Sequence, residues 1–219
     1  MIRKFISLYK TNDLVRDNVL LFAGTMIVNF FSFLFHFYMG RVLGPEDYGV
    51  LGVLLSFSYF LNVFLHSLQS SIAKFVAGFR VTSSFGKIQF LFRQAVVRLS
   101  LYGLLGVVIF YLFIPFVSSF LHIAEKSLFY IIGLLILFTL LLPLVRGIMQ
   151  GLQQFTVLGF NLTIEGLVKF FGGVLFVSFG WAVQGAVLAF VLSMFVPFLF
   201  GFSGRGSFEI ICYCSFFTL

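Results

Sequence analysis

Two side chains of opposite charge lie four residues apart in a long apolar stretch of the sequence. Glu165 and Lys169 fall within positions 155–178, and Asn161 and Gly172 share their face of a helix built from this stretch. An ionised group at the centre of a bilayer costs about 2.5–3.5 kcal/mol on insertion scales, so we expect the pair to face the interior of a helical bundle. The pair then either neutralises itself and orients the helix, or senses the charge of a bound molecule or a coupling ion.

If the two side chains form an isolated ion pair, the effect of replacing them on the stability of the fold can be predicted. Replacing Lys169 by Ala would leave the carboxylate of Glu165 without a counter-charge, whereas replacing Glu165 by Gln together with Lys169 by Met would remove both charges. We therefore expect the double replacement to disturb the fold less than either single one.

Uncharged polar residues follow one face of each of the first two apolar stretches. Their spacings of three and four residues place each set along one side of a helix. The sets are Thr25, Asn29, Ser32 and His36 in the first stretch, and Ser58, Asn62, His66 and Gln69 in the second. Interhelical hydrogen bonds of such residues are worth about 0.6 to 2 kcal/mol each. We expect the small residues to pack in this way, and Asn62, His66 and Gln69 either to pack or to line a wet cavity.

No arrangement of residues indicates covalent chemistry, so we expect neither an enzyme nor a cofactor. The sequence shows no nucleophile paired with a base, no phosphate-binding glycine loop and no cluster of metal ligands around its histidines. Cys212 and Cys214 are the only cysteines, and their spacing fits neither a zinc site nor a redox motif. The net charge of +7 is dispersed between apolar runs, which argues against nucleic acid as a partner.

The composition indicates that membrane-spanning helices position these side chains. Of 219 residues, 61% are hydrophobic and 10% are charged, against about 45–50% and 25% in soluble domains. A bilayer core about 30 Å thick requires roughly 20 helical residues. Six stretches meet that length: 19–37, 48–67, 95–116, 128–145, 155–178 and 181–202. We predict an all-α, polytopic integral membrane protein with a six-helix bundle over 18–202, preceded by a cytoplasmic segment, 1–17.

The lysines and arginines predict the orientation of this bundle, because cytoplasmic loops retain them. Eleven of the fourteen fall on one side of the predicted topology: Arg3, Lys4, Lys10, Arg16, Lys74, Arg80, Lys87, Arg93, Arg98, Arg146 and Arg205. Only Arg41 and Lys126 fall on the other side, and Lys169 lies within a helix. The amino terminus is therefore predicted to be cytoplasmic, in a multi-pass protein of the plasma membrane.

Three short motifs resemble those of a known transporter family. They are RVLGPEDYGV at 41–50, GIMQGLQQF at 147–155 and GWAVQGA at 180–186, which lie between the first and second, the fourth and fifth, and the fifth and sixth stretches. Their residues and spacing resemble polysaccharide biosynthesis flippases of the multidrug/oligosaccharidyl-lipid/polysaccharide exporter superfamily. The resemblance extends over about residues 15–200.

The resemblance implies that the six helices form one lobe of a two-lobe transporter. Flippases of this family are roughly twice as long, and they hold a polyprenyl-diphosphate-linked sugar in a cavity between two lobes that rock to expose it. An anionic diphosphate favours cations, so Lys169 is a candidate contact, with Arg41 near the outer mouth. A drug or cation antiporter, in which Glu165 would be the coupling residue, is the alternative within the superfamily. The candidate substrate-binding residues are Lys169, Glu165, Asn62, His66, Gln69 and Arg41.

The motif at 41–50 predicts a tight turn after which a new helix begins. Pro45 fixes φ at the start of a turn, and the acidic residues that follow it favour the first turn of a helix. The turn would make the first two helices antiparallel neighbours, or would also form an outer gate in which Arg41 pairs with Glu46 or Asp47. Arg146, at the end of the fourth stretch, is expected to anchor its helix at the interface.

The end of the chain departs from the family pattern. Its last apolar run, 210–219, has about half the length needed to cross a bilayer. We expect 203–219 to be an atypical tail produced by truncation or a frameshift. A chain with one lobe would then pair with a second half-chain or a second copy, or would be a non-transporting fragment.

Overall fold

The structure is a computed structural model that describes residues 2–121 and 125–203. Six long α-helices account for nearly all of this range, which confirms the predicted all-α class. They are α1 (Ile2–Val42), α2 (Gly44–Val81), α3 (Phe85–Leu121), α4 (Lys126–Gly151), α5 (Phe155–Phe176) and α6 (Ala182–Ser203), with one π-helical turn, η1 (Val177–Trp181), before α6. Cys212, Cys214 and the rest of 204–219 lie outside the described residues.

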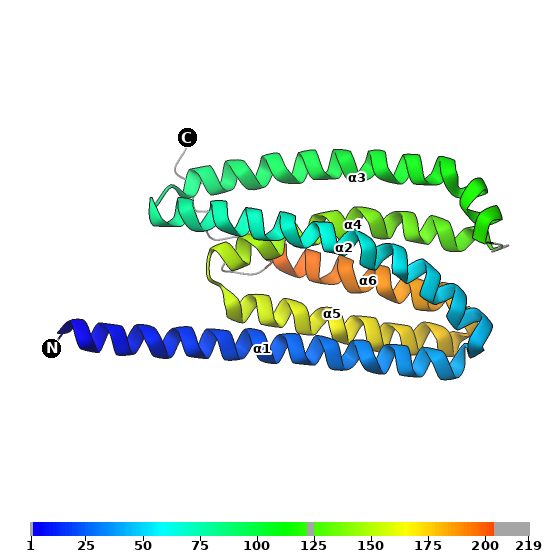
Figure 1. Cartoon of the computed structure of the whole chain (residues 1–219), viewed down its shortest axis with the longest axis horizontal. Coiled ribbons are helices and arrows are strands. Elements are labelled where there is room, and N and C mark those ends of the chain that lie inside the picture. Colours follow the sequence, from blue (N-terminus) through cyan, green and yellow to red (C-terminus); the bar gives the residue numbers. More distant parts are fainter. Residues whose placement is uncertain (1, 122–124, 204–219) are drawn as a thin grey trace.

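Five continuous stretches of the described chain are long and apolar enough to cross a bilayer. They are 18–42, 44–81, 85–121, 127–151 and 155–201. The fifth stretch contains both α5 and α6, which follow each other without a loop. The backbone bends between them at Gly180, where φ is 85° and the conformation is not helical. Figure 1 shows that α6 runs back beside α5. The described residues therefore form six membrane-length helices, as the sequence predicts.

The first three helices are longer than the apolar stretches that predicted them. α2 has 38 residues, so it is about 57 Å long, roughly twice the thickness of the hydrocarbon core. Only residues 82–84 separate α2 from α3. Lys74, Arg80 and Lys87 therefore lie on helices that extend beyond the apolar stretches, and not in a loop.

The helices are not packed in chain order. α1 packs mainly on α5, α5 on α6, α2 on α4, and α4 also contacts α3 and α6. Figure 1 shows α1 and α2 diverging from the turn that joins them. The two helices are in contact near this turn, through His36, Tyr48 and Tyr59, but each has its main partner elsewhere. This divergence leaves space between α1 and α2 that other helices line.

The turn between α1 and α2 has the predicted local structure. Gly44 has a φ of 77°, a left-handed conformation that glycine adopts without steric cost, and Pro45 lies in the first turn of α2. Glu46 and Asp47 occupy that same turn. Arg41 pairs with neither acid in the described structure; its guanidinium carbon lies 4.5 Å from the ring centroid of Phe37. The outer gate through an Arg41 ion pair is therefore not formed.

Close approaches between glycines bring particular helices together. A Cβ at Gly24 would lie 2.8 Å from the Cα of Gly159, so α1 and α5 are nearly in backbone contact there. On α4, a Cβ at Gly147 would lie 2.8 Å from the carbonyl oxygen of Gln69, and one at Gly151 would lie 2.7 Å from that of Ala73. The small-residue pair of the second motif thus packs α4 against α2, besides preceding the turn at 152–154.

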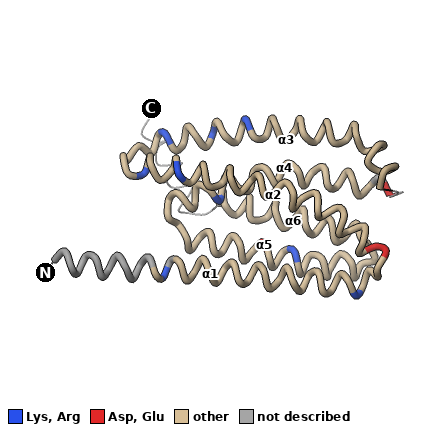
Figure 2. The backbone as a smooth tube through the Cα atoms, viewed as in Figure 1, with Lys and Arg blue, Asp and Glu red and all other residues tan. Residues whose placement is uncertain are grey.

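Figure 2 shows that charge is distributed unequally between the two ends of the bundle. Lysines and arginines gather where α2 meets α3. Glu46 and Asp47 lie at the opposite end, at the turn between α1 and α2. The bundle therefore has a basic end and an acidic end, and the charged residues of the middle lie on α4 and α5.

Candidate functional site

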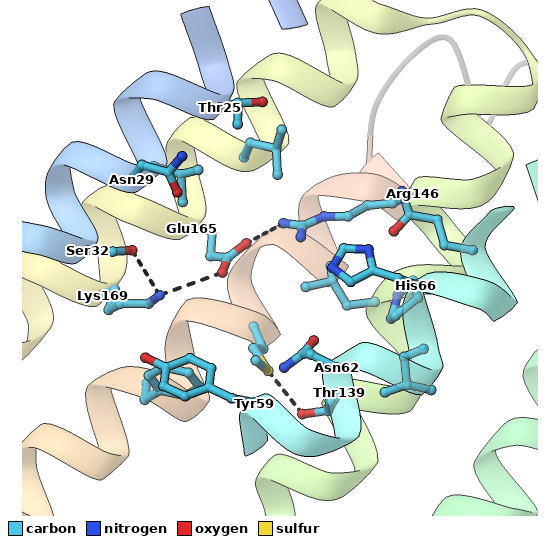
Figure 3. A pocket seen from close by; sticks show the side chains of 18 residues that line it. Thr25, Asn29, Ser32, Tyr59, Asn62, His66, Thr139, Arg146, Glu165 and Lys169 are labelled. Carbon is cyan, nitrogen blue, oxygen red and sulfur yellow. Dashed lines mark hydrogen bonds and ion pairs between the residues drawn. The ribbon is translucent and has the colours of Figure 1, made fainter. Parts of the chain in front are cut away.

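A polar cavity of about 450 Å³ lies in the space left by the divergence of α1 and α2. Five helices supply its wall, and most of its polar side chains are drawn in Figure 3. The polar lining consists of Thr25, Asn29, Ser32, Tyr59, Asn62, His66, Gln69, Thr139, Arg146, Glu165 and Lys169. Three members of each predicted polar stripe therefore line the same cavity, which their helical spacing alone could not decide, whereas His36 and Ser58 lie outside the lining.

Three charged side chains meet in the wall of this cavity. Arg146 Nη2 donates a hydrogen bond of 2.6 Å to Glu165 Oε2, and Lys169 Nζ lies 3.8 Å from Glu165 Oε1. Figure 3 shows the carboxylate between the two cations. The predicted pair of Glu165 and Lys169 is present, but it belongs to a triad in which its distance is the longer of the two. Arg146 is the nearer partner of the carboxylate.

This position of Arg146 corrects the expectation that it anchors α4 at the membrane interface. Its side chain is 13% exposed and lies against the inner face of α5. Its Nε donates 2.9 Å to Asn161 Oδ1, whose own Nδ2 donates 2.7 Å to the carbonyl oxygen of Pro197. That carbonyl belongs to α6, so the arginine is held between α4, α5 and α6. The guanidinium is fixed in orientation by these contacts.

Lys169 has a separate set of contacts on the opposite side of the carboxylate. Nζ donates a hydrogen bond of 3.2 Å to Ser32 Oγ on α1 and lies 4.8 Å from the ring centroid of Phe190 on α6. The side chain is 7% exposed. An ammonium held by a hydroxyl, a distant carboxylate and an aromatic face is less completely neutralised than Arg146. It is the better placed of the two cations to accept a further anion.

The other predicted binding residues fall into two groups. Asn62, His66 and Gln69 line the cavity from α2, whereas Arg41 lies in the last turn of α1, beside the turn that carries Glu46 and Asp47, and is not part of the lining. Asn62 Nδ2 donates 2.8 Å to the carbonyl oxygen of Ser58, and Gln69 Nε2 donates 3.2 Å to Gln150 Oε1. The candidate site thus includes five of the six predicted residues, and their role in binding stays a prediction.

An aromatic and histidine cluster joins α1 to α2 on the side of the cavity towards their turn. The two ring nitrogens of His36 lie 3.2 Å from Tyr48 OH and 3.0 Å from Tyr59 OH. Tyr59 also lines the cavity. The sequence placed His36 on the polar stripe of α1 but assigned no role to Tyr59. The spacing of three residues between Tyr59 and Asn62 was the signal that could have placed Tyr59 on the same face of the helix.

The lining of the cavity is polar and carries more basic than acidic groups. Within the described part of the chain, no group of three or more histidine, cysteine, aspartate or glutamate residues could hold a metal ion. Two cations face one acid, and amides, hydroxyls and one imidazole surround them. Such a lining can hold an anionic or polyhydroxylated group by hydrogen bonds and charge.

Comparison with known proteins supports this architecture. No protein-family model matches the sequence, and no curated protein sequence matches it. Among solved structures, the chain is similar to an outward-facing multidrug resistance transporter of the MATE family, in the MOP superfamily, with a TM-score of 0.71 and 14% identity. The match covers 90% of this chain and 49% of that one, so the chain spans about half the length of the transporter.

This likeness shows the fold, and the superfamily that the sequence motifs indicate stays a prediction. The described helices have the fold of about half of that transporter. The flippase family within the superfamily stays a prediction.

Proposed function

We propose that this chain is one lobe of a transporter that moves a lipid-linked oligosaccharide across the plasma membrane. The observation that carries the proposal is the triad of Arg146, Glu165 and Lys169 in the wall of a polar cavity inside an otherwise apolar bundle. Charges at this depth are costly, and the surplus of one cation suits an anionic headgroup. A polyprenyl diphosphate linked to a sugar has that charge, and its hydroxyls suit the amides of α2.

The contacts of the triad suggest how such a headgroup would be received. Glu165 neutralises Arg146 at 2.6 Å but lies 3.8 Å from Lys169, so an incoming phosphate can pair with Lys169 without first displacing the carboxylate from Arg146. Asn62, His66 and Gln69 lie across the cavity on a different helix. Movement of α2 against α5 would therefore alter both sides of the site together, as alternating access requires.

A drug or cation antiporter is the second candidate function. Glu165 is the one acidic residue of the described cavity lining, and two cations compete for it. A carboxylate in this setting suits coupling to a proton or to a cationic substrate. The solved structure that resembles this chain is itself described as a multidrug resistance transporter.

A single genetic experiment separates the two candidates. The reading frame of this chain is deleted in its host, and the cells are assayed for sugar-linked polyprenyl lipid on the cytoplasmic face and for sensitivity to cationic drugs. Accumulation of the lipid, reversed by the chain, supports the flippase. Drug sensitivity without accumulation overturns the flippase proposal in favour of the antiporter, and the absence of both phenotypes overturns transport.

A complete transport path needs a second lobe, so we propose a second half-chain or a second copy as the partner. Large apolar side chains on α1 and α2, including Phe33, Phe60 and Phe64, are more than 60% exposed, which leaves a surface for lipid or for such a lobe. The size of the purified chain in detergent tests this. A strict monomer, with no other chain co-purifying from its host, would contradict a two-lobe transporter and favour a non-transporting fragment.

A further inference from the structure

A second hollow lies outside the polar cavity, between α2 and α3 at the basic end of the bundle. Both helices pack on α4 but make little contact with each other, which leaves a hollow of about 570 Å³ between them. An adjoining hollow of about 560 Å³ shares part of its lining. The two hollows share Ser71, Phe75, Phe79 and Lys87. We call the two together the α2–α3 groove.

The walls of the α2–α3 groove are apolar, and its edges carry three cations. Leu68, Leu91 and Leu99 are among its apolar residues, and Lys74, Lys87 and Arg98 are the charged ones. Lys87, Gln94 and Arg98 follow at intervals of seven and four along α3, so they lie on one face. Figure 2 shows basic residues on both helices near the end where α2 and α3 meet, and further basic residues along α3.

These cations have no acidic partner in the described structure. α3 contains no acidic residue, and the acids of α2 lie in its first turn at the opposite end of the bundle. Among the described residues, none of the three cations of the groove forms an ion pair. Three cations gathered around an apolar groove without a protein anion are electrostatically unfavourable alone, and an anion that also has an apolar part would stabilise them.

The position of the groove relative to the membrane identifies that anion. From Leu99 to Leu121, α3 has no charged residue over 23 positions, about 34 Å of helix, which matches the hydrocarbon core. Arg98 is the last charge before this stretch, and Tyr102, one turn further on, is an aromatic residue of the interfacial type. The groove therefore opens at the level of the lipid headgroups.

We propose that the α2–α3 groove is a binding site for an anionic phospholipid of the surrounding leaflet. Its phosphate lies between Lys74 and Lys87, which line the same hollow, and one acyl chain runs along the groove past Arg98, about 16 Å further along α3, towards Leu99 and Tyr102. By the distribution of basic residues, this leaflet is the cytoplasmic one. The site is separate from the polar cavity and does not depend on what the cavity transports.

Native mass spectrometry of the purified chain in detergent tests the proposal with two lipids of identical acyl chains, dioleoyl phosphatidylglycerol and dioleoyl phosphatidylcholine. We expect the chain to retain the phosphatidylglycerol in preference. Lys87→Gln should weaken its retention about fivefold, and the triple variant Lys74→Gln, Lys87→Gln and Arg98→Gln by about a hundredfold. Lys87→Arg, which keeps the charge, should retain it.

Arg93 supplies the matched control, because it is an exposed cation of α3 that lines neither hollow. Arg93→Gln should leave retention unchanged. Equal retention of the two lipids, or an equal loss in Arg93→Gln and Lys87→Gln, would show general attraction to a basic surface and overturn the site. A dimer that the triple variant dissociates would assign the groove to a second copy instead. Displacement of the phosphatidylglycerol by polyprenyl phosphate at lower concentration would assign it to the transported lipid. The single variants carry the test if the triple variant purifies poorly.

Discussion

Arg146 Nη2 and Glu165 Oε2 are 2.6 Å apart in a cavity wall that α4 and α5 share, well inside the apolar part of the chain. This contact joins two helices that otherwise touch little, because α5 packs mainly on α1 and α6. The carboxylate thus neutralises its nearest cation across helices, while the lysine on its own helix is 3.8 Å away. The stability and the charge of the cavity depend on this order of distances.

Replacing Glu165 by Gln should destabilise the chain more than replacing Lys169 by Met. The first change leaves Arg146 and Lys169 facing each other without an acid, at a cost of about 1–3 kcal/mol once water in the cavity is allowed for. The second leaves the closer ion pair intact and should cost less than about 1 kcal/mol. Thermal unfolding in detergent, followed by circular dichroism, measures both. Equal losses for the two variants would show that the lysine, and not the arginine, is the main partner.

The same distances reverse the expectation for the double variant. Glu165→Gln with Lys169→Met was expected to be better tolerated than either single change, on the premise of an isolated pair. Because Arg146 would then remain without an acid, we now expect this double variant to be no more stable than Lys169→Met alone. Arg146→Gln combined with Glu165→Gln removes the nearer pair and serves as the comparison in the same unfolding experiment.

The contact of α1 with α5 should be sensitive to a single methyl group. Gly24→Ala places a Cβ within 2.8 Å of the Gly159 backbone, which a side-chain movement cannot relieve. We expect a loss of about 1–3 kcal/mol, typical of overpacking. Gly52→Ala on α2 is the control, since a Cβ there meets nothing within 4 Å and alanine is the better helix former. Similar melting temperatures for the two variants would contradict the close approach.

Local sequence predicted the helices and turns well because their causes are local. The length of each apolar stretch, Pro45 at a helix start and glycine at a left-handed position each act within a few residues. The polar stripes were also assigned correctly to single helix faces. Which helices pair could not be predicted, because the Gly24 and Gly159 contact joins residues 135 positions apart and leaves no period in the sequence.

The partners of Arg146 at the candidate site could not be predicted from local sequence either. Its position near the end of an apolar stretch is typical of an interfacial anchor, and nothing within α4 indicates an acid as its partner. Only the packing of α4, α5 and α6 brings it to Asn161 and Glu165. The sequence offered one indication of this partner: Glu165 is the only acid between residues 126 and 203, so it is the only acid of this region that could neutralise Arg146.

The two ends of the bundle should lie on opposite sides of the membrane, with the basic end cytoplasmic. A topology reporter fused after Ser83 should report the cytoplasm, and one fused after Pro45 should report the exterior. Figure 2 shows the charge difference on which this rests. Fusion after Arg16 is a control that should agree with Ser83. A cytoplasmic signal after Pro45 would reverse the orientation and move the proposed phospholipid site to the outer leaflet.

The last prediction concerns Lys169 and Glu165 in transport by the chain together with its second lobe. If an anionic headgroup binds in the cavity, Lys169→Met removes a charge-assisted contact worth about 1.5–3 kcal/mol, which corresponds to about a 10- to 150-fold loss of sugar-lipid export. Because the pair of Arg146 and Glu165 survives in this variant, the loss should appear with little change in melting temperature. Lys169→Arg should restore much of the export, since it keeps the cation. For an antiporter the order is different: Glu165→Gln abolishes drug efflux, and its defect exceeds that of Lys169→Met. Export and melting temperature measured on the same preparations distinguish the cases, and full export in Lys169→Met would remove the lysine from the binding site.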